Sequence, residues 1–343
     1  MSNQINEIKF EDILLRNIIS LDKVKKYYEF LKTNHKIIIE AEKKDINIYT
    51  GTYKNRINDL CIKDDETLHK YTTITDYFID DVRLECHRSQ LTSPKDFFLN
   101  DTALLKEFNK VIQLPENAKR EKNDIMRQLV LQHKNCQLFP IDLLLSILKI
   151  YKPTKILDMC AGWGDRLIAA LLYGNADYVG VDPNHKLKPG YDEIVKQFSG
   201  LKNSNQKECT YTTITSAFEN CKYQTLVTDN KLFDLMLSSP PYFISEKYSN
   251  DPDQSYFHHD LLNWLERFMY PSINLIYSVM KKGGYVLMVI NDVYLFRNNK
   301  HEKVEYVDKI IKYFSQNKFI LIDIMKISIM TSIQPLLVFK KLY

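Results

Sequence analysis

The chain has 343 residues, of which 45% are hydrophobic and 26% charged, and its formal net charge is +4. This composition is that of a globular protein, and the lack of internal repeats, low-complexity linkers and long apolar runs excludes repeat, disordered and membrane-spanning classes. The length suffices for one large domain or two ordinary ones, and the small positive charge is compatible with a polyanionic partner without requiring one.

The cysteines indicate the compartment. Six are scattered along the chain without C-x-x-C spacing: Cys61, Cys86, Cys136, Cys160, Cys209 and Cys221. We predict that all six are reduced thiols, with neither a disulfide nor a zinc site. The first residues are polar and charged, unlike a signal peptide. We therefore expect an intracellular, soluble, cytoplasmic protein that is not secreted and carries no metal.

Residues 1–130 are predicted to be a mostly helical N-terminal region. Apolar residues recur at helical spacing over residues 10–19 and 23–31, and another helix is expected over residues 119–132. The segment 46–53 has the composition of a small hairpin. The region carries no motif that indicates an activity, and we consider it a candidate for target recognition.

Residues 131–343 are predicted to form the second domain, which begins with a helix at 141–150. A short apolar strand, Ile156–Leu157, then runs into a glycine-bearing turn that opens an amphipathic helix at 166–173. A second strand, 178–181, ends in Asp182. This order predicts a βαβ unit in which glycines let the backbone approach a ligand and the acid accepts hydrogen bonds from both hydroxyls of a ribose.

The glycine turn favours a single-nucleoside cofactor over a dinucleotide. Its spacing is Gly162-x-Gly164, and Leu167 stands where the full G-x-G-x-x-G pattern requires a third glycine. An ordinary tight turn is the alternative explanation for a Gly-x-Gly pair taken alone.

The remaining segments complete an α/β fold. We expect strands at 211–214, 233–237 and 285–290, a helix over 261–279 that Pro271 kinks, and a helix over 304–314. The segments 319–325 and 335–339 are predicted to close the sheet as an antiparallel hairpin. The expected architecture is a Rossmann-like, doubly wound and mainly parallel sheet.

A stiff corner follows the strand at 233–237. Its sequence is Ser239, Pro240, Pro241 and Tyr242. Both prolines have a fixed φ and no N–H, the tyrosine offers a π-face, and the serine hydroxyl and Pro240 carbonyl can accept hydrogen bonds from an exocyclic NH2 group. The corner is therefore suited to hold a flat, amine-bearing ring. A rigid loop with a core tyrosine is the alternative.

The glycine turn and the Ser-Pro-Pro-Tyr corner, in this order, resemble the S-adenosylmethionine-dependent amino-methyltransferases of nucleic acids, of the DNA cytosine-N4 and adenine-N6 type. The resemblance covers roughly residues 136–343. It implies that S-adenosylmethionine is the cofactor and that the target base lies against Ser239–Tyr242. The cofactor-binding residues that it implies are Asp158, Cys160, Ala161, Gly162, Gly164, Asp182, Pro183, Ala217 and Phe218.

Two positions depart from the family pattern, because Trp163 and Asp165 replace the small residues usual in the first motif. The resemblance also implies that a segment before this motif forms the other wall of the methionine pocket, for which Phe139–Pro140 is the candidate. An ordinary helix start is the alternative for that pair.

The resemblance implies methyl transfer to the exocyclic amine of a base, with cytosine N4 in DNA preferred because serine precedes the two prolines. Adenine N6 in DNA or RNA, including a cap-adjacent adenosine, remains an alternative. Methylation of a protein glutamine is another alternative, and a further one is that the chain is an inactive subunit with a binding role. Nucleic acid is the expected partner, with DNA favoured over RNA, and no association with a membrane is expected.

Two further segments have competing interpretations. The polar stretch 246–256 is expected to be a lid over the substrate or else a plain surface loop. Basic residues of the N-terminal region can contact phosphates or form a solvated face. They are Arg83, His87, Arg88, Lys119, Arg120, Lys122 and Arg127. The pair His258–His259 lacks a third metal ligand at suitable spacing.

Overall fold

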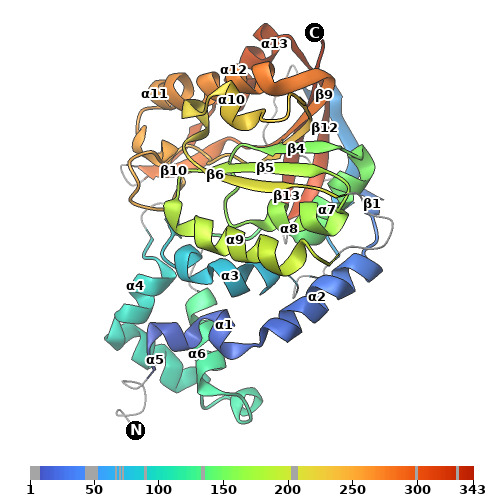
Figure 1. Ribbon diagram of the computed structural model, residues 1–343. Helices are drawn as coiled ribbons and strands as arrows, with labels where there is room; N and C mark the ends of the chain where they lie inside the picture. Colours follow the sequence, from blue (N-terminus) through green and yellow to red (C-terminus); the bar gives the residue numbers. More distant parts are fainter. Residues whose placement is uncertain are drawn as a thin grey trace.

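The computed structural model describes residues 8–42, 53–65, 68, 71, 73–88, 91–132, 136–201, 208–297, 300–329 and 332–343. Within these residues the core is a nine-stranded sheet of order β1-β2-β12-β13-β9-β7-β4-β5-β6, flanked by helices on both faces (Figure 1). The hairpin predicted at 46–53 lies outside the described residues except for Tyr53.

Five consecutive parallel strands form one side of the sheet, with β6 at its edge. They are β4 (Lys155–Asp158), β5 (Asp177–Asp182), β6 (Tyr211–Thr215), β7 (Phe233–Ser238) and β9 (Met280–Val289). Strands β4 and β7 are neighbours, and the chain order runs outward from them in opposite directions. This is the switch point of a doubly wound sheet, outside whose carboxyl ends ligands bind.

An antiparallel hairpin closes the sheet, as predicted. Strand β12 (Phe319–Ile329) pairs with β13 (Ser332–Lys341), and β13 runs antiparallel to β9. The α/β, mainly parallel and doubly wound fold is thereby confirmed.

The N-terminal region adds two strands that the sequence did not predict. Strand β2 (Ile57–Lys63) pairs in parallel with β12, and β1 (Ile38–Ala41) pairs antiparallel with β2 at the edge. Strand β1 is mostly exposed, so it lacks the apolar alternation that reveals a half-buried strand. The first part of the chain is therefore helical with a sheet extension, and it shares the central sheet.

Helices cover both faces of the sheet (Figure 1). One apolar core joins the sheet to α7 (Ile141–Tyr151), α8 (Asp165–Tyr173) and α9 (Lys188–Phe198). The other joins it to α10 (Tyr223–Leu226), α11 (Leu261–Trp264), α12 (Tyr270–Val279) and α13 (Val307–Gln316). Buried Leu, Ile, Val and Phe side chains on each face supply the hydrophobic stabilisation of this three-layer arrangement.

The helix predicted over 261–279 is divided in the structure. A π-helical turn, Leu265–Met269, separates α11 from α12, and Pro271 lies in the first turn of α12. The residue before α12, Met269, is itself helical, so Pro271 follows the π-helical turn without a break in the helical segment. The predicted interruption therefore takes the form of a π-helical turn, one of the usual ways in which a helix is locally distorted.

The N-terminal helices form a further layer below α9 in Figure 1. They are α1 (Leu15–Ile18), α2 (Leu21–Asn34), α3 (Thr73–Arg83), α4 (Pro94–Leu99), α5 (Asp101–Val111) and α6 (Lys122–Gln132). Residues of α4, α5 and α6 build a small apolar core of their own, while α2 and α3 pack into the core beneath the sheet.

A buried ion network ties these helices together. Arg83 binds the carboxylate of Asp76, and Arg127 pairs with Asp76 and, at 2.5 Å, with Asp80. All four side chains are nearly inaccessible to solvent. Removing one partner of such a network leaves a buried charge uncompensated, so Arg83 and Arg127 have structural roles and cannot contact phosphates.

The prediction of six reduced thiols is wrong for two of them, because Cys86 and Cys136 form a disulfide. Their separation of 50 residues and the absence of a C-x-x-C pattern concealed the pair in the sequence. The N-terminal region and the start of the second domain approach each other at this point. Cys61, Cys160, Cys209 and Cys221 are free thiols.

Two small strand pairs lie outside the large sheet. Strand β3 (His87–Arg88) pairs with β8 (Glu246–Lys247), and β10 (Val293–Arg297) pairs with β11 (Lys300–Val304). None of the described helices has both the length and the apolar character needed to span a bilayer.

The contact between α3 and α9 gives a stability prediction. A Cβ on Gly190 of α9 would lie 2.9 Å from the Phe78 carbonyl oxygen and closer still to the Ile79 side chain. We therefore expect Gly190→Ala to destabilise the fold by about 1–3 kcal/mol through overpacking, despite the better helix propensity of alanine. Urea denaturation measures the change.

Gly200 is the matched control, since a Cβ there meets no atom within 4 Å. Gly200→Ala should leave the free energy of unfolding unchanged or raise it slightly. A Gly190→Ala protein as stable as the parent would contradict the close α3–α9 packing.

Candidate active site

The glycine turn and the double-proline corner lie side by side at one edge of the sheet. They follow β4 and β7, which are adjacent parallel strands. The Ser238 hydroxyl donates to Asp158 Oδ1 at 2.7 Å and accepts from the Cys160 N–H at 3.2 Å. These hydrogen bonds join the two bends directly.

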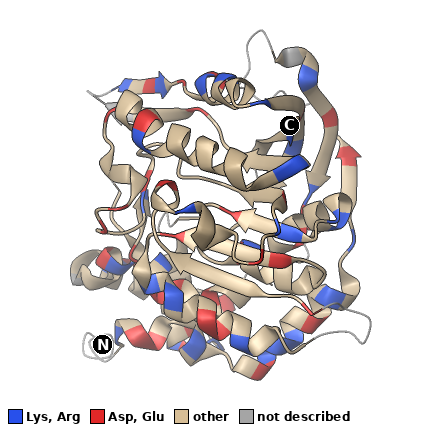
Figure 2. Cartoon of the chain, turned by 45° about the horizontal axis from the view of Figure 1, so that its top comes forward, with Lys and Arg blue, Asp and Glu red and all other residues tan. Residues whose placement is uncertain are grey.

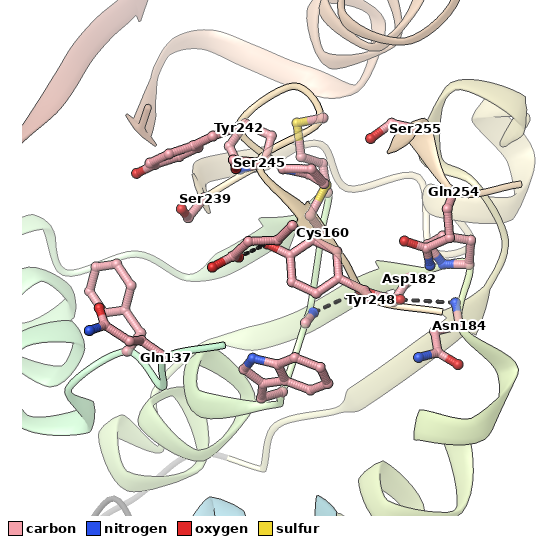
Figure 3. Close-up of a pocket in the computed structure, with 18 of the residues that line it drawn as sticks. Gln137, Cys160, Asp182, Asn184, Ser239, Tyr242, Ser245, Tyr248, Gln254 and Ser255 are labelled. Atoms are coloured by element: carbon pink, nitrogen blue, oxygen red, sulfur yellow. Dashed lines mark hydrogen bonds between the residues drawn. The ribbon is translucent and has the colours of Figure 1, made fainter. Parts of the chain in front are cut away.

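Both bends open into one cavity of about 440 Å³. Figure 3 shows Ser239 and Tyr242 at one end, Cys160 and Tyr248 in the middle, and Asp182, Asn184 and Gln254 at the other end. The sequence-predicted residues that line it are Cys160, Gly162, Asp182, Pro183, Ala217, Phe218, Ser239, Pro240, Pro241 and Tyr242. Residues from four separate segments thus meet in one cavity.

Three residues predicted to touch the cofactor lie outside the cavity lining: Asp158, Ala161 and Gly164. Asp158 is fully buried and also accepts hydrogen bonds from Arg166 Nε at 2.7 Å and from the Tyr178 hydroxyl at 2.9 Å. Because its oxygens are occupied by these partners and by Ser238, Asp158 orients the loop from behind. The implied direct contact is therefore corrected to a supporting one.

The glycines shape the turn. Gly164 has φ of 92° at the N-terminus of α8, a conformation that disfavours side chains. A Cβ there would lie 3.4 Å from ring atoms of Tyr191. Gly162, with φ of 57°, donates its N–H to Asp182 Oδ2 at 2.9 Å. The turn is thereby fixed to the tip of β5.

Asp182 is held by two backbone donors, the N–H groups of Gly162 and Asn184, each at 2.9 Å. Each carboxylate oxygen keeps a second lone pair for a ligand. Burial raises the pKa of Asp182 to about 6, against the opposing effect of these two hydrogen bonds.

Three polar groups that the sequence analysis missed are unpaired around the cavity. Asn184 Nδ2, Glu219 Oε2 and Ser255 Oγ are buried and have no hydrogen-bond partner among the described residues. All three residues line the cavity. Because burying a polar group without a partner is unfavourable, this set indicates a polar ligand at this end. Glu219 had a sequence signal in its place directly after Phe218, and Ser255 in its place within the expected lid.

The wall opposite the glycine turn is formed by Gln137, Leu138 and Phe139. The Phe139 N–H donates to Asp165 Oδ2 at 2.9 Å, and the Thr75 hydroxyl donates to Asp165 Oδ1 at 2.5 Å. Asp165, which departs from the family pattern, therefore clamps this wall to α8 and α3. Pro140 is buried at the start of α7 and does not line the cavity.

The segment 246–256 lies over the cavity, as expected for a lid. Glu246, Tyr248, Gln254 and Ser255 line it. Tyr248 meets the ring of Trp163 edge to face, with centroids 5.8 Å apart. Trp163, the other residue that departs from the family pattern, thus contacts the lid. At its base, Glu246 forms an ion pair with Arg88 of β3, with Nε and Oε1 3.2 Å apart.

The cavity lining is rich in carboxylates. They come from Asp165, Asp182, Glu219, Glu246, Asp253 and Asp292. The lining cations among the described residues are Arg88, paired with Glu246, and Arg166, paired with Asp158. A ligand with a positive charge therefore fits this cavity better than a phosphate group does.

Several basic residues considered for phosphate contacts have internal partners. Arg120 pairs with Asp124, in addition to the buried pairs of Arg83 and Arg127. Figure 2 shows Lys and Arg interspersed with Asp and Glu along the helices of its lower part. In the described region, no group of three or more His, Cys, Asp or Glu side chains is arranged to hold a metal.

Comparisons with known proteins add likenesses of fold. No protein-family model and no curated protein matches the sequence. Among solved structures, TrmN from Thermus thermophilus aligns at 15% identity over 59% of this chain and 49% of its own length, with a TM-score of 0.36. The N-methyltransferase NodS from Bradyrhizobium japonicum aligns at 10% identity over 58% of this chain and 93% of its own, with a TM-score of 0.37.

An O-methyltransferase from a Brevibacillus brevis polyketide multienzyme, solved with S-adenosyl-L-homocysteine, aligns at 12% identity. It covers 65% of this chain and 77% of its own length, with a TM-score of 0.39. Likenesses at this level carry no argument about substrate, so the function is argued from the site.

The disulfide gives a second prediction. Thiol titration of the unfolded, non-reduced protein should count four free thiols, since Cys86 and Cys136 are bonded. The double variant Cys86→Ser, Cys136→Ser should unfold with a free energy about 2–4 kcal/mol lower, because the link restricts the unfolded chain. A count of six thiols would show that the bond does not form.

Glu219 gives a third prediction. Burial raises the pKa of its carboxyl to about 7 from its ordinary value of 4.5. The folded state therefore retains a proton that the unfolded state releases, and the stability contribution of Glu219 falls as the pH rises from about 4.5 to 7. We expect Glu219→Gln to be more stable than the parent at pH 8, by about 3 kcal/mol at most, and equally stable at pH 5.

Urea denaturation at both pH values measures this difference. Glu302→Gln, at an exposed position, should show no such pH dependence. A stability difference that is the same at pH 5 and pH 8 would refute the raised pKa.

Proposed function

We propose that this protein transfers a methyl group from S-adenosylmethionine to the exocyclic amine of a nucleic-acid base, cytosine N4 in DNA. The observation that carries the proposal is the junction of the two bends through Ser238, Asp158 and Cys160, with both bends open to one cavity. This arrangement holds a donor and an amine in adjacent places, which is the main requirement of methyl transfer.

The end of the cavity around Asp182 is suited to adenosine. The free lone pairs of Asp182 can accept from the ribose hydroxyls, and the unpaired groups of Asn184, Glu219 and Ser255 can bind the polar edge of the adenine. The acidic lining is favourable for a sulfonium cation. When bound, S-adenosylmethionine supplies an electrophilic methyl group.

The other end is suited to an amine on a flat ring. Ser239 Oγ and the Pro240 carbonyl accept hydrogen bonds from the NH2 group, which draws its nitrogen out of conjugation and directs its lone pair toward the donor. Tyr242 provides the stacking face. Burial raises the pKa of Tyr242 to about 12, so its hydroxyl stays neutral and hydrogen-bonds with Ser239.

Serine in place of a carboxylate before Pro240 supports cytosine N4 over adenine N6, through the family resemblance. A base inside a duplex cannot reach this cavity, so it must be flipped out or single-stranded. Because the lining is acidic, the phosphates of the polymer would lie outside the cavity.

The deciding experiment incubates the full-length protein with tritiated S-adenosylmethionine and DNA, RNA or protein, followed by mass spectrometry of the product. We expect label in DNA as N4-methylcytosine. Asp182→Ala should weaken cofactor binding about 10–100-fold in calorimetry, the loss expected for charge-assisted hydrogen bonds. Tyr242→Ala should abolish transfer while leaving cofactor affinity within about threefold.

Tyr343→Ala, at an exposed tyrosine outside the cavity lining, serves as the matched control and should keep parental activity. Label in adenine or in protein glutamine would replace the proposed acceptor. Absence of cofactor binding by the parent protein would refute the function as a whole.

A further inference from the structure

The proposed reaction leaves an extra proton on the methylated nitrogen. Ser239 and the Pro240 carbonyl can accept hydrogen bonds from the amine, but neither is a base that holds a proton near neutral pH. We propose that Glu246, at the base of the lid, is the catalytic carboxylate that accepts an N–H of the target amine and takes its proton. This inference rests on the proposed function.

The position of Glu246 supports the assignment. It begins β8, four residues after Tyr242, and lines the same cavity as the Ser239–Tyr242 corner. Its charge contributes to the raised pKa of Tyr242, whose side chain in turn hydrogen-bonds with Ser239. The carboxylate therefore lies close to the corner that holds the amine.

Three contacts orient the Glu246 side chain. Arg88 Nε lies 3.2 Å from Oε1, the Tyr248 hydroxyl donates to Oε2, and the backbones of Arg88 and Glu246 are partners in the β3–β8 ladder. The side chain is 20% exposed, and each oxygen retains a lone pair for the substrate. Arg88, which lies 158 positions earlier in the chain, thus orients the Glu246 carboxylate through the pairing of β3 with β8.

The other carboxylates of the cavity belong to other parts of its wall or are exposed. Asp165 is held by Thr75 and Phe139, and Asp292 Oδ1 accepts from the N–H groups of Tyr306 and Val307 at the start of α13. Asp182 and Glu219 belong to the end proposed for adenosine, and Asp253 is exposed on the lid. Glu246 is the lining carboxylate with both a fixed orientation and proximity to Ser239–Tyr242.

The titratable and charged groups that face Glu246 are Arg88 from β3, Tyr242 from the corner after β7 and Tyr248 from the lid. Burial raises the pKa of both tyrosines, that of Tyr242 to about 12. Neither tyrosine ionises at neutral pH, so neither competes with Glu246 as the base.

The step balances as follows. The nitrogen lone pair forms the new N–C bond while the S–C bond breaks and its electron pair stays on sulfur. The proton on nitrogen passes to the Glu246 carboxylate, and the N–H bonding pair becomes the nitrogen lone pair of the product. Glu246 returns the proton to water when product leaves.

The test compares Glu246→Gln with the parent protein, using a pool of single-stranded oligodeoxynucleotides and measuring methyl transfer from pH 5 to 9. Glutamine keeps the shape, since its amide oxygen can still accept from Arg88 and its NH2 group can donate to the Tyr248 hydroxyl, but it cannot take a proton. We expect kcat to fall about 10²-fold or more, with cofactor affinity within about twofold. The decrease of the parent's rate at acid pH should disappear.

Glu246→Asp, which keeps the carboxylate, should recover part of kcat and restore the decrease at acid pH. Glu85→Gln is the matched control. Glu85 pairs with Lys95 and Lys186 and lies outside the lining of the active-site cavity, so its variant should retain parental rates.

Two results would overturn the proposal while leaving the methyltransferase function intact. One is parental kcat in Glu246→Gln. The other is a loss confined to KM, with the acid-side pH profile unchanged, which would show that Glu246 only fastens the lid to Arg88. A parent protein that binds no cofactor would instead refute the proposed function itself.

Discussion

The site depends on the hydrogen bond between Ser238 and Asp158, across the ends of two adjacent parallel strands. Asp158 is a buried carboxylate, and its desolvation is compensated by Arg166, Tyr178 and Ser238 together. Since Ser238 directly precedes the double-proline corner, the same network that supports the glycine turn also sets the position of Ser239. The proposed donor and acceptor sites are therefore connected by one hydrogen-bonded network.

The remaining walls are attached to this unit from distant parts of the chain. Asp165 binds the Phe139 N–H and the Thr75 hydroxyl, so the wall before α7 and the helix α3 share one carboxylate. The Cys86–Cys136 disulfide joins the same wall to β3, which pairs with β8 of the lid. The N-terminal region is thus part of the cavity's construction, whatever it contributes to target recognition.

The charge of the cavity bears differently on the two ligands of the proposed reaction, the sulfonium donor and the nucleic-acid polymer. An acidic cavity is favourable for a sulfonium donor and for removal of a proton, but unfavourable for phosphates. The small net charge and the mixed signs along the helices in Figure 2 agree with polymer contacts outside the cavity. Glu246 is held by Arg88 and by Tyr248 of the lid, and it lines the same cavity as the corner at which the amine is proposed to bind.

The sequence by itself determined the βαβ unit, the closing hairpin and the order of the two bends, because strand and helix periodicity and Gly or Pro chemistry depend on near neighbours in the chain. Its motifs indicated ten of the lining residues, and Phe139 and the lid segment were further candidates. Only the tertiary structure decided that Asp158 turns inward, that β1 and β2 extend the sheet, that Cys86 meets Cys136, and that Arg88 meets Glu246. Those pairings depend on strand register and loop packing between residues tens to hundreds of positions apart, which no local pattern encodes.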